Sequence, residues 1–195
     1  MDLSKVFKSL ERIIELDEYE KDIFTSLVEI AIIKRNQYLL TEGERCGYEY
    51  FVINGCLRSF YRDENANEHT TLFAIEGWWT GNLKSFVRNT PSEFYIQAVE
   101  DTVVMRIHKK NMDELYSKIP KLERYFRILL QNRLLATQDR ISKHLSESAL
   151  TRFSNFLMLY PTLEQRIPAK HIASYLGITP TYLSRLRKKN IKSAL

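Results

Sequence analysis

IPAKHIASYLGITPTYLSRLRKK, residues 167–189, is the stretch that decides the fold. Its spacing is typical of a helix-turn-helix, with the small Ala173 where two helices must approach closely and Gly177 where the turn needs a positive φ. Thr179 and Pro180 are start signals for the second helix, as N-cap and first helical residue. Each helix has one apolar face to bury: Ile172, Leu176, Ile178, Leu183 and Leu186. A helical hairpin that only packs is the alternative, and it does not require these features together.

The exposed side of the second predicted helix is polar and cationic. Side chains of this kind suit the floor and walls of a DNA major groove. The candidate DNA-binding residues there are Thr179, Thr181, Tyr182, Ser184, Arg185, Arg187, Lys188 and Lys189.

The charge of the chain is divided unevenly along its length. Residues 121–195 hold 14 Lys and Arg against 4 Asp and Glu, whereas residues 1–120 hold 15 against 20. No Asp or Glu follows Pro168. Such a run attracts phosphates in a salt-dependent way. Charge alone indicates a polyanionic partner, and the helix-turn-helix pattern narrows it to double-stranded DNA.

Composition narrows the class of protein further. A chain of 195 residues can hold one large domain, or one medium domain with a small satellite. The N-terminus lacks a signal-peptide layout and no segment reaches about 18 uninterrupted apolar residues, so we expect a cytoplasmic protein without a membrane partner. Cys46 and Cys56 are too few for a disulfide scaffold or a thiolate cluster and are expected to be buried thiols. The four histidines show no ligand spacing, so no metal site is predicted. Neither a cofactor nor an enzymatic activity is expected for this chain.

Three regimes of periodicity follow one another. Residues 3–33 show helical spacing, with a break at Asp17 and Glu18. Residues 37–107 are short runs rich in aromatic and β-branched residues, separated by turn signals, which predicts an antiparallel β-roll of the jelly-roll kind. Helical spacing returns at residues 111–144. The fold class is therefore α+β, with a β-roll, flanking helices, a long helix and a C-terminal helix-turn-helix.

The long helix, residues 121–144, is the candidate dimer contact. Its broad stripe comprises Leu122, Phe126, Leu129, Arg133, Ala136, Arg140 and Ile141. Twin recognition helices must reach major grooves about 34 Å apart, which a two-fold homodimer achieves. Because two arginines interrupt the stripe, packing of this helix on its own roll remains open. The predicted domains are residues 1–120 (roll), 121–145 (dimerisation helix) and 146–195 (helix-turn-helix), with Ser146 to Ser148 as hinge and a helix at residues 149–159.

This order of parts resembles the Crp/Fnr family of bacterial transcription regulators over nearly the whole chain. Within the roll, Gly43, the run YFVING at 50–55 and the run GWWTGNL at 77–83 look like turns and strand exits of the family's cyclic-nucleotide-binding roll. The resemblance implies that Thr179 meets a phosphate and that Arg185 reaches base edges, where a guanidinium can pair with guanine O6 and N7. It also implies RNA polymerase as a partner and an unknown small-molecule effector.

The effector pocket departs from the family pattern. Members that bind cyclic AMP carry Gly-Glu-Leu at the pocket lip and an Arg-Ser pair that grips the phosphate, whereas this chain has Gly81-Asn82-Leu83 and Ser92-Glu93. A carboxylate in place of the cation repels an anion. We therefore expect a degenerate pocket that does not respond to cyclic AMP, with Arg88 as the one nearby cation able to replace the missing arginine.

The recognition helix departs too, because Pro180 and Thr181 stand where well-known members have Arg and Glu. The six residues after position 189 leave no room for a β-hairpin wing. Two other classes of function stay open. A sensor or oligomerisation module without DNA binding would show no steep salt dependence. A cupin-type metalloenzyme would need a ligand cluster on adjacent strands, where the sequence offers only His69 and His108.

Overall fold

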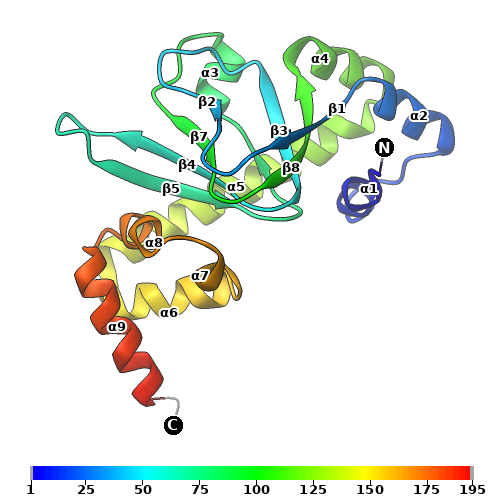
Figure 1. The fold of residues 1–195 in the computed structure, drawn as a ribbon. Coiled ribbons are helices and arrows are strands. Elements are labelled where there is room, and N and C mark those ends of the chain that lie inside the picture. Colours follow the sequence, from blue (N-terminus) through cyan, green and yellow to red (C-terminus); the bar gives the residue numbers. More distant parts are fainter. Residues whose placement is uncertain (1, 194–195) are drawn as a thin grey trace. The chain divides into compact units, whose positions relative to one another are not determined.

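The computed structural model describes the backbone of residues 2–193 and the side chains of residues 2–188. It divides into two compact units (Figure 1). The first comprises Met1–Ser59 and Phe73–Arg133, and the second comprises Phe60–Leu72 and Leu134–Leu195. The boundary between the two units passes through the long helix after Arg133 and across the hairpin that contains residues 60–72. Antiparallel sheets, flanking helices and a C-terminal helical region confirm the predicted α+β class.

Two four-stranded sheets form the roll. One has the order β1-β8-β3-β6, and the other has the order β2-β7-β4-β5. The strands are β1 (Glu29–Ile33), β2 (Tyr38–Leu40), β3 (Tyr48–Asn54), β4 (Leu57–Arg62), β5 (Glu68–Ala74), β6 (Trp79–Thr80), β7 (Tyr95–Ala98) and β8 (Thr102–His108). Inward side chains such as Phe51, Leu57 and Met105 are fully buried in one core.

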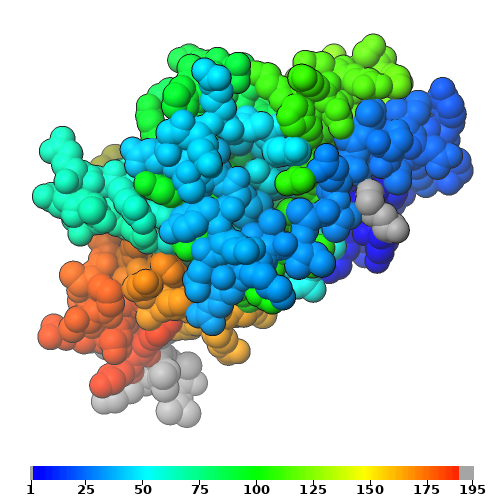
Figure 2. Space-filling view, turned by 45° about the horizontal axis from the view of Figure 1, so that its top comes forward, coloured from blue at the N-terminus to red at the C-terminus, as the bar shows by residue number. Residues whose placement is uncertain are grey.

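Three short helices flank the roll and one interrupts its strands. They are α1 (Ser4–Leu10), α2 (Glu18–Ser26), α4 (Lys109–Lys118) and, between strands, α3 (Leu83–Arg88). Asp17 begins α2 with a capping box, in which its carboxylate accepts from the Glu20 amide and the Glu20 carboxylate accepts from the Asp17 amide. In Figure 2, α2 (blue) lies directly against α4 (light green), in line with their mutual contacts.

The prediction that helical structure extends to residue 33 is wrong. Residues 29–33 form β1, which pairs antiparallel with β8 and places Ile30 opposite Met105 and Ile32 opposite Val103. Three of its five residues are isoleucine, whose β-branched side chain favours a strand once a partner strand is available. The helical spacing of Ile23, Leu27 and Ile30 was therefore a coincidence across an element boundary.

The long helix α5 (Lys121–Ser146) is slightly longer than predicted, and its first half belongs to the roll. Leu122, Tyr125 and Phe126 are buried. The Trp79 indole donates to the Tyr125 hydroxyl at 2.9 Å and its ring meets the Phe126 ring edge-on at 5.0 Å between centroids. Leu129 packs on the same core. The predicted stripe is thus wrong as a single dimer seam, because its first members are covered by the chain's own roll.

The remaining helices form the C-terminal region. They are α6 (Ala149–Leu159), α7 (Leu163–Arg166), α8 (Ala169–Leu176) and α9 (Pro180–Ser193). Ser148 begins α6, where its hydroxyl accepts from the Thr151 amide at 3.2 Å, as expected for an N-cap. The bounds of α6 agree with the sequence prediction.

Candidate DNA-binding surface and effector pocket

Helices α8 and α9 have the local geometry of a helix-turn-helix. Ala173 is fully buried, and Leu176, Leu183 and Leu186 are buried around it. Gly177 ends α8 in the left-handed region, at φ 66°. The Thr179 hydroxyl accepts from the Tyr182 amide at 3.2 Å and so begins α9. The small residue, the glycine and the cap therefore act as their spacing in the sequence predicts.

A cation on α6 fixes this motif to the preceding helix. The Arg152 guanidinium donates to the Glu147 carbonyl at 2.8 Å and to the Leu176 carbonyl at 3.2 Å, at the end of α8. Positively charged donors at a helix C-terminus satisfy orphan carbonyls and interact favourably with the helix dipole. Arg152 therefore holds the turn of the motif against the bend at Glu147 that follows α5, a role for which the sequence carries no local signal.

The outward face of α9 remains available to a partner. Thr181, Ser184, Arg185 and Lys188 are exposed, and Tyr182 is 44% exposed. The Thr179 side chain at the helix start is also exposed. A helix N-terminus and two cations on one face match the charge of a phosphate backbone, while Arg185 can offer two donors to one base edge.

Two other predicted DNA-binding residues differ from this group. The Arg187 Nε lies 2.7 Å from a Glu164 carboxylate oxygen on α7, and both side chains are about two-thirds buried. That contact is an ion pair without hydrogen-bond geometry. It turns Arg187 toward its own domain, so Arg187 is not part of the proposed reading face. Lys189 belongs to α9, but its side chain lies outside the described residues.

A side chain at Gly177 is disfavoured by a neighbouring side chain as well as by the positive φ. A Cβ at this position would lie 2.6 Å from His144 Cε1. We expect Gly177→Ala to destabilise the C-terminal region by about 1–3 kcal/mol, through strain at positive φ and displacement of His144. Thermal unfolding measures this change. Gly43→Ala is the matched control, since Gly43 has φ 86° and a Cβ there would meet nothing within 4 Å, so it isolates the backbone cost. An unchanged melting temperature in Gly177→Ala would contradict the assigned turn.

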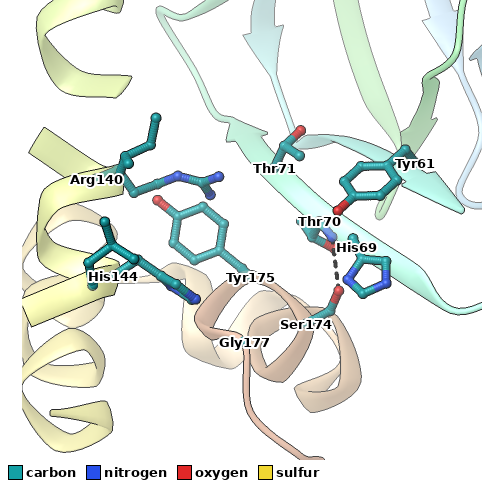
Figure 3. Close-up of a pocket in the computed structure, with 11 residues that line it drawn as sticks. Tyr61, His69, Thr70, Thr71, Arg140, His144, Ser174, Tyr175 and Gly177 are labelled. Carbon is teal, nitrogen blue, oxygen red and sulfur yellow. Dashed lines mark hydrogen bonds between the residues drawn. The ribbon is translucent and has the colours of Figure 1, made fainter. Parts of the chain in front are cut away.

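A pocket of about 270 Å³ lies within the second unit, between α5, α8 and the β4–β5 hairpin (Figure 3). Ser174 fastens α8 there, because its hydroxyl accepts from the Thr70 amide at 2.9 Å and donates to the Glu68 carbonyl at 2.5 Å. The Arg140 guanidinium lies over the Tyr175 ring, 5.0 Å from its centroid. Burial, with Arg152 and Arg140 adding to it, holds the pKa of His144 below its ordinary value. The sequence carries no local signal for these contacts between α8 of the helix-turn-helix and the β4–β5 hairpin.

Two of the predicted effector-binding side chains in the roll, Asn82 and Ser92, are hydrogen-bonded to each other. The Asn82 amide donates to the Ser92 hydroxyl at 3.0 Å, while its carbonyl oxygen accepts from the Ser85 amide and so caps α3. Ser92 is only 2% exposed, and its hydroxyl donates to the Phe94 carbonyl. Hydrogen bonds that close a pocket lip in this way leave neither side chain free to receive a ribose hydroxyl or a phosphate.

The other members of this set do not gather at one point. Glu93 forms an exposed ion pair with Lys84 at 2.6 Å. Leu83 and Arg88 line a shallow surface hollow together with Lys84 and Val87. Gly81 is buried, and its backbone approaches the Glu49 carboxylate. The five predicted pocket residues therefore do not converge on one anion-binding centre.

Two of the four histidines, His69 and His108, have local hydrogen-bonding partners. His69 pairs with Asp63 at 2.9 Å, and His108 accepts from the Lys110 amide at the start of α4. His171 is buried in the helix-turn-helix. Within the described part of the chain no group of three or more His, Cys, Asp or Glu is placed to hold a metal ion. Cys46 and Cys56 are buried thiols, as predicted. None of the described helices is long and apolar enough to cross a bilayer.

Comparison with known proteins agrees with this architecture. The sequence pattern of the cyclic nucleotide-binding domain matches residues 32–118. The fumarate and nitrate reduction regulatory protein of Vibrio cholerae is 27% identical over 192 residues, covering 92% of this chain and 76% of that protein.

Solved structures share the fold. FixK2 from Bradyrhizobium japonicum aligns with a TM-score of 0.74 at 17% identity and covers 86% of both chains. A transcriptional regulator of the Crp/Fnr family from Eubacterium rectale aligns with a TM-score of 0.71 at 18% identity, covering 91% of this chain and 85% of that one. Each of these two alignments covers more than four-fifths of this chain.

Proposed function

We propose that this chain, which resembles the Crp/Fnr regulators in sequence and fold, is a sequence-specific, DNA-binding transcriptional regulator that works as a two-fold dimer. The observation that carries the proposal is the outward face of α9, where Thr181, Tyr182, Ser184, Arg185 and Lys188 are exposed together. The relatives are regulatory proteins, which favours regulation over catalysis. RNA polymerase remains a proposed partner.

The proposed contacts with duplex DNA are of two kinds. Arg185 reads a base edge, whereas Thr179 and Lys188 meet phosphates at the two sides of the groove. Phosphate contacts fix the position of the helix and make the affinity fall with salt, while base contacts discriminate between sequences. Selection of bound fragments from genomic DNA, followed by titration against random duplex at several salt concentrations, tests this function. Equal affinity for selected and random duplex would contradict it.

The dimer contact that we propose is the exposed line of α5 and not the predicted stripe. Leu130, Leu134, Ile141 and Leu145 are 39%, 58%, 54% and 83% exposed. Their spacing of four, seven and four residues places them on one side of a helix, as in the seam of a coiled coil. Four exposed aliphatic side chains on one face of a helix are most simply buried against the same face of a second copy of the chain.

We further propose that cyclic nucleotides are not the effector. At the lip of the predicted effector pocket, the Asn82 amide is hydrogen-bonded to the Ser92 hydroxyl, and Glu93 forms an ion pair with Lys84. Desolvating a cyclic phosphate without a cation would cost several kcal/mol. Calorimetric titration with cyclic AMP and cyclic GMP is therefore expected to show no binding at micromolar concentration. Binding that disappears in Arg88→Ala would show instead that Arg88 supplies the missing cation.

A further inference from the structure

The cavity of about 270 Å³ between α5, α8 and the β4–β5 hairpin is lined by none of the proposed DNA-contacting residues (Figure 3). At about 30 Å³ for each water molecule it would hold roughly nine, so its size suits a small ligand. No Asp or Glu is among the residues that line it. Two carboxylates on the same hairpin, those of Asp63 and Glu68, are paired with His69 and Arg62. The charge of the wall therefore favours an anion.

Arg140 is the cation of this wall. Its guanidinium lies over the Tyr175 ring, 5.0 Å from the ring centroid, and Figure 3 shows the side chain extending from α5 toward α8. It forms no ion pair or hydrogen bond with any described residue. A guanidinium that is stacked on a ring keeps the N–H donors in its own plane for a carboxylate. Arg140 is thus held in place by a contact that leaves its donors available.

Two more groups of the wall have polar side-chain atoms without a partner among the described residues. Thr70 is only 4% exposed, and its hydroxyl makes no hydrogen bond. The His144 imidazole, one helical turn after Arg140, makes none either. A buried hydroxyl without a partner costs free energy, and native proteins contain few of them. An anion in the cavity would supply the acceptor that these groups lack.

The remainder of the wall is largely apolar. Ile141 and Leu145, which also belong to the proposed dimer line, border the cavity on α5. The Tyr61 ring on β4 borders it from the hairpin and stacks on the His69 ring, with 5.0 Å between centroids and 19° between planes. A cavity with a cationic point and apolar sides fits a ligand that has one anionic group on a short apolar body.

We propose that this cavity binds a small organic carboxylate with an aromatic or short aliphatic body, and that this ligand is an effector of the helix-turn-helix. The ligand carboxylate accepts from the Arg140 guanidinium and the Thr70 hydroxyl. Because Tyr175 of α8 borders the same cavity, the ligand restricts the motion of α8 against α5 and the hairpin. Ordering α8 in advance lowers the cost of ordering it on DNA, so the ligand raises the affinity for DNA. The inference rests on the proposed function and deepens it by naming the class of effector.

Calorimetry and thermal unfolding of the full chain with benzoate and with butyrate test the site. At least one of them at millimolar concentration should bind and raise the melting temperature. Benzamide, which has the shape of benzoate without its charge, should bind at least about tenfold more weakly than benzoate. Acetate, which lacks the apolar body, should also bind more weakly. Inorganic phosphate that binds more tightly than either carboxylate would contradict the ligand class.

Replacing the cation of the wall locates the binding. Arg140→Gln should weaken carboxylate binding by about tenfold or more, because it removes the charge that the ligand pairs with. Lys143→Gln is the matched control. Lys143 is exposed on the same turn of α5 and does not line the cavity, so the same loss of charge there should leave the affinity nearly unchanged.

Replacing Thr70 separates recognition from a structural role. Thr70→Val should weaken binding and leave the fold at least as stable, because a methyl group of similar size replaces a buried hydroxyl without a partner. Thr70→Ser, which keeps the hydroxyl, should retain binding. Thr90→Val is the control, since the Thr90 hydroxyl is also buried without a partner among the described residues but does not line the cavity. A less stable Thr70→Val protein with unchanged binding would contradict this role.

Affinity for a selected duplex, measured with and without the carboxylate, tests the effector role. A saturating concentration should raise it about fivefold or more in the native chain and not in Arg140→Gln. The inference is overturned by the absence of binding for both benzoate and butyrate, by unchanged binding in Arg140→Gln, or by unchanged duplex affinity. Sequence-specific DNA binding that persists in these cases rejects only the effector, whereas its absence both with and without ligand rejects the proposed function.

Discussion

Replacing Arg185 with alanine should weaken binding to a selected duplex by about 1–3 kcal/mol, which is about five- to 150-fold. The side chain is exposed on α9 and has two donors that can pair with one guanine. Binding to random duplex should change much less, because phosphate contacts supply most of that affinity. Fluorescence anisotropy on selected duplexes with each base pair varied in turn should show relaxed preference at one position.

Lys188→Ala is the matched control on the same helix. Its exposed ammonium group is proposed to meet a phosphate, so its loss should weaken all duplexes alike and reduce the slope of affinity against salt by about one. Equal losses on selected and random duplex for Arg185→Ala would refute the base-reading assignment. They would leave α9 as a helix that contacts only the DNA backbone.

Leu134→Glu should convert the proposed dimer into a monomer and reduce affinity for a two-half-site duplex by more than about 100-fold. A carboxylate in the seam would be buried against its own copy, at a cost of several kcal/mol per dimer. Leu134 is 58% exposed in the single chain, so the change should leave the folded protomer intact. Analytical ultracentrifugation measures the mass, and thermal unfolding verifies the fold.

Leu135→Glu is the matched control for Leu134→Glu. Leu135 is also 58% exposed, but it lies about 100° around the helix from Leu134 and off the proposed line. It should leave the mass unchanged. Leu129→Glu, by contrast, should destabilise the roll itself, because Leu129 packs on its core. A dimeric Leu134→Glu protein would place the contact on another surface.

The parts that could be predicted from the sequence are those encoded locally. Gly177, Thr179 and Pro180 act through their own backbone and nearest turn, so the helix-turn-helix is apparent from residue type and spacing alone. The same holds for Ser148 at the start of α6. Such signals need no knowledge of a distant neighbour.

The errors concern long-range pairing. Residues 29–33 become a strand because β8, about 70 residues later, supplies a partner. The sequence also shows that α5 has an apolar side, but not that Leu122 and Phe126 face the roll while Leu134 and Ile141 stay open. The ion pair of Arg187 with Glu164 and the proximity of Glu49 to Gly81 likewise depend on residues that are not neighbours in the chain.

The proposal on which the others depend is that this chain reads duplex DNA as a dimer through α9. The stoichiometry and affinity of the native protein decide it, measured at physiological salt on a genomically selected duplex and on a scrambled duplex of the same length. We expect two protomers per selected duplex, and an affinity at least about 10³-fold above that for the scrambled one. One protomer per duplex, or equal affinity for both sequences, would contradict this proposal.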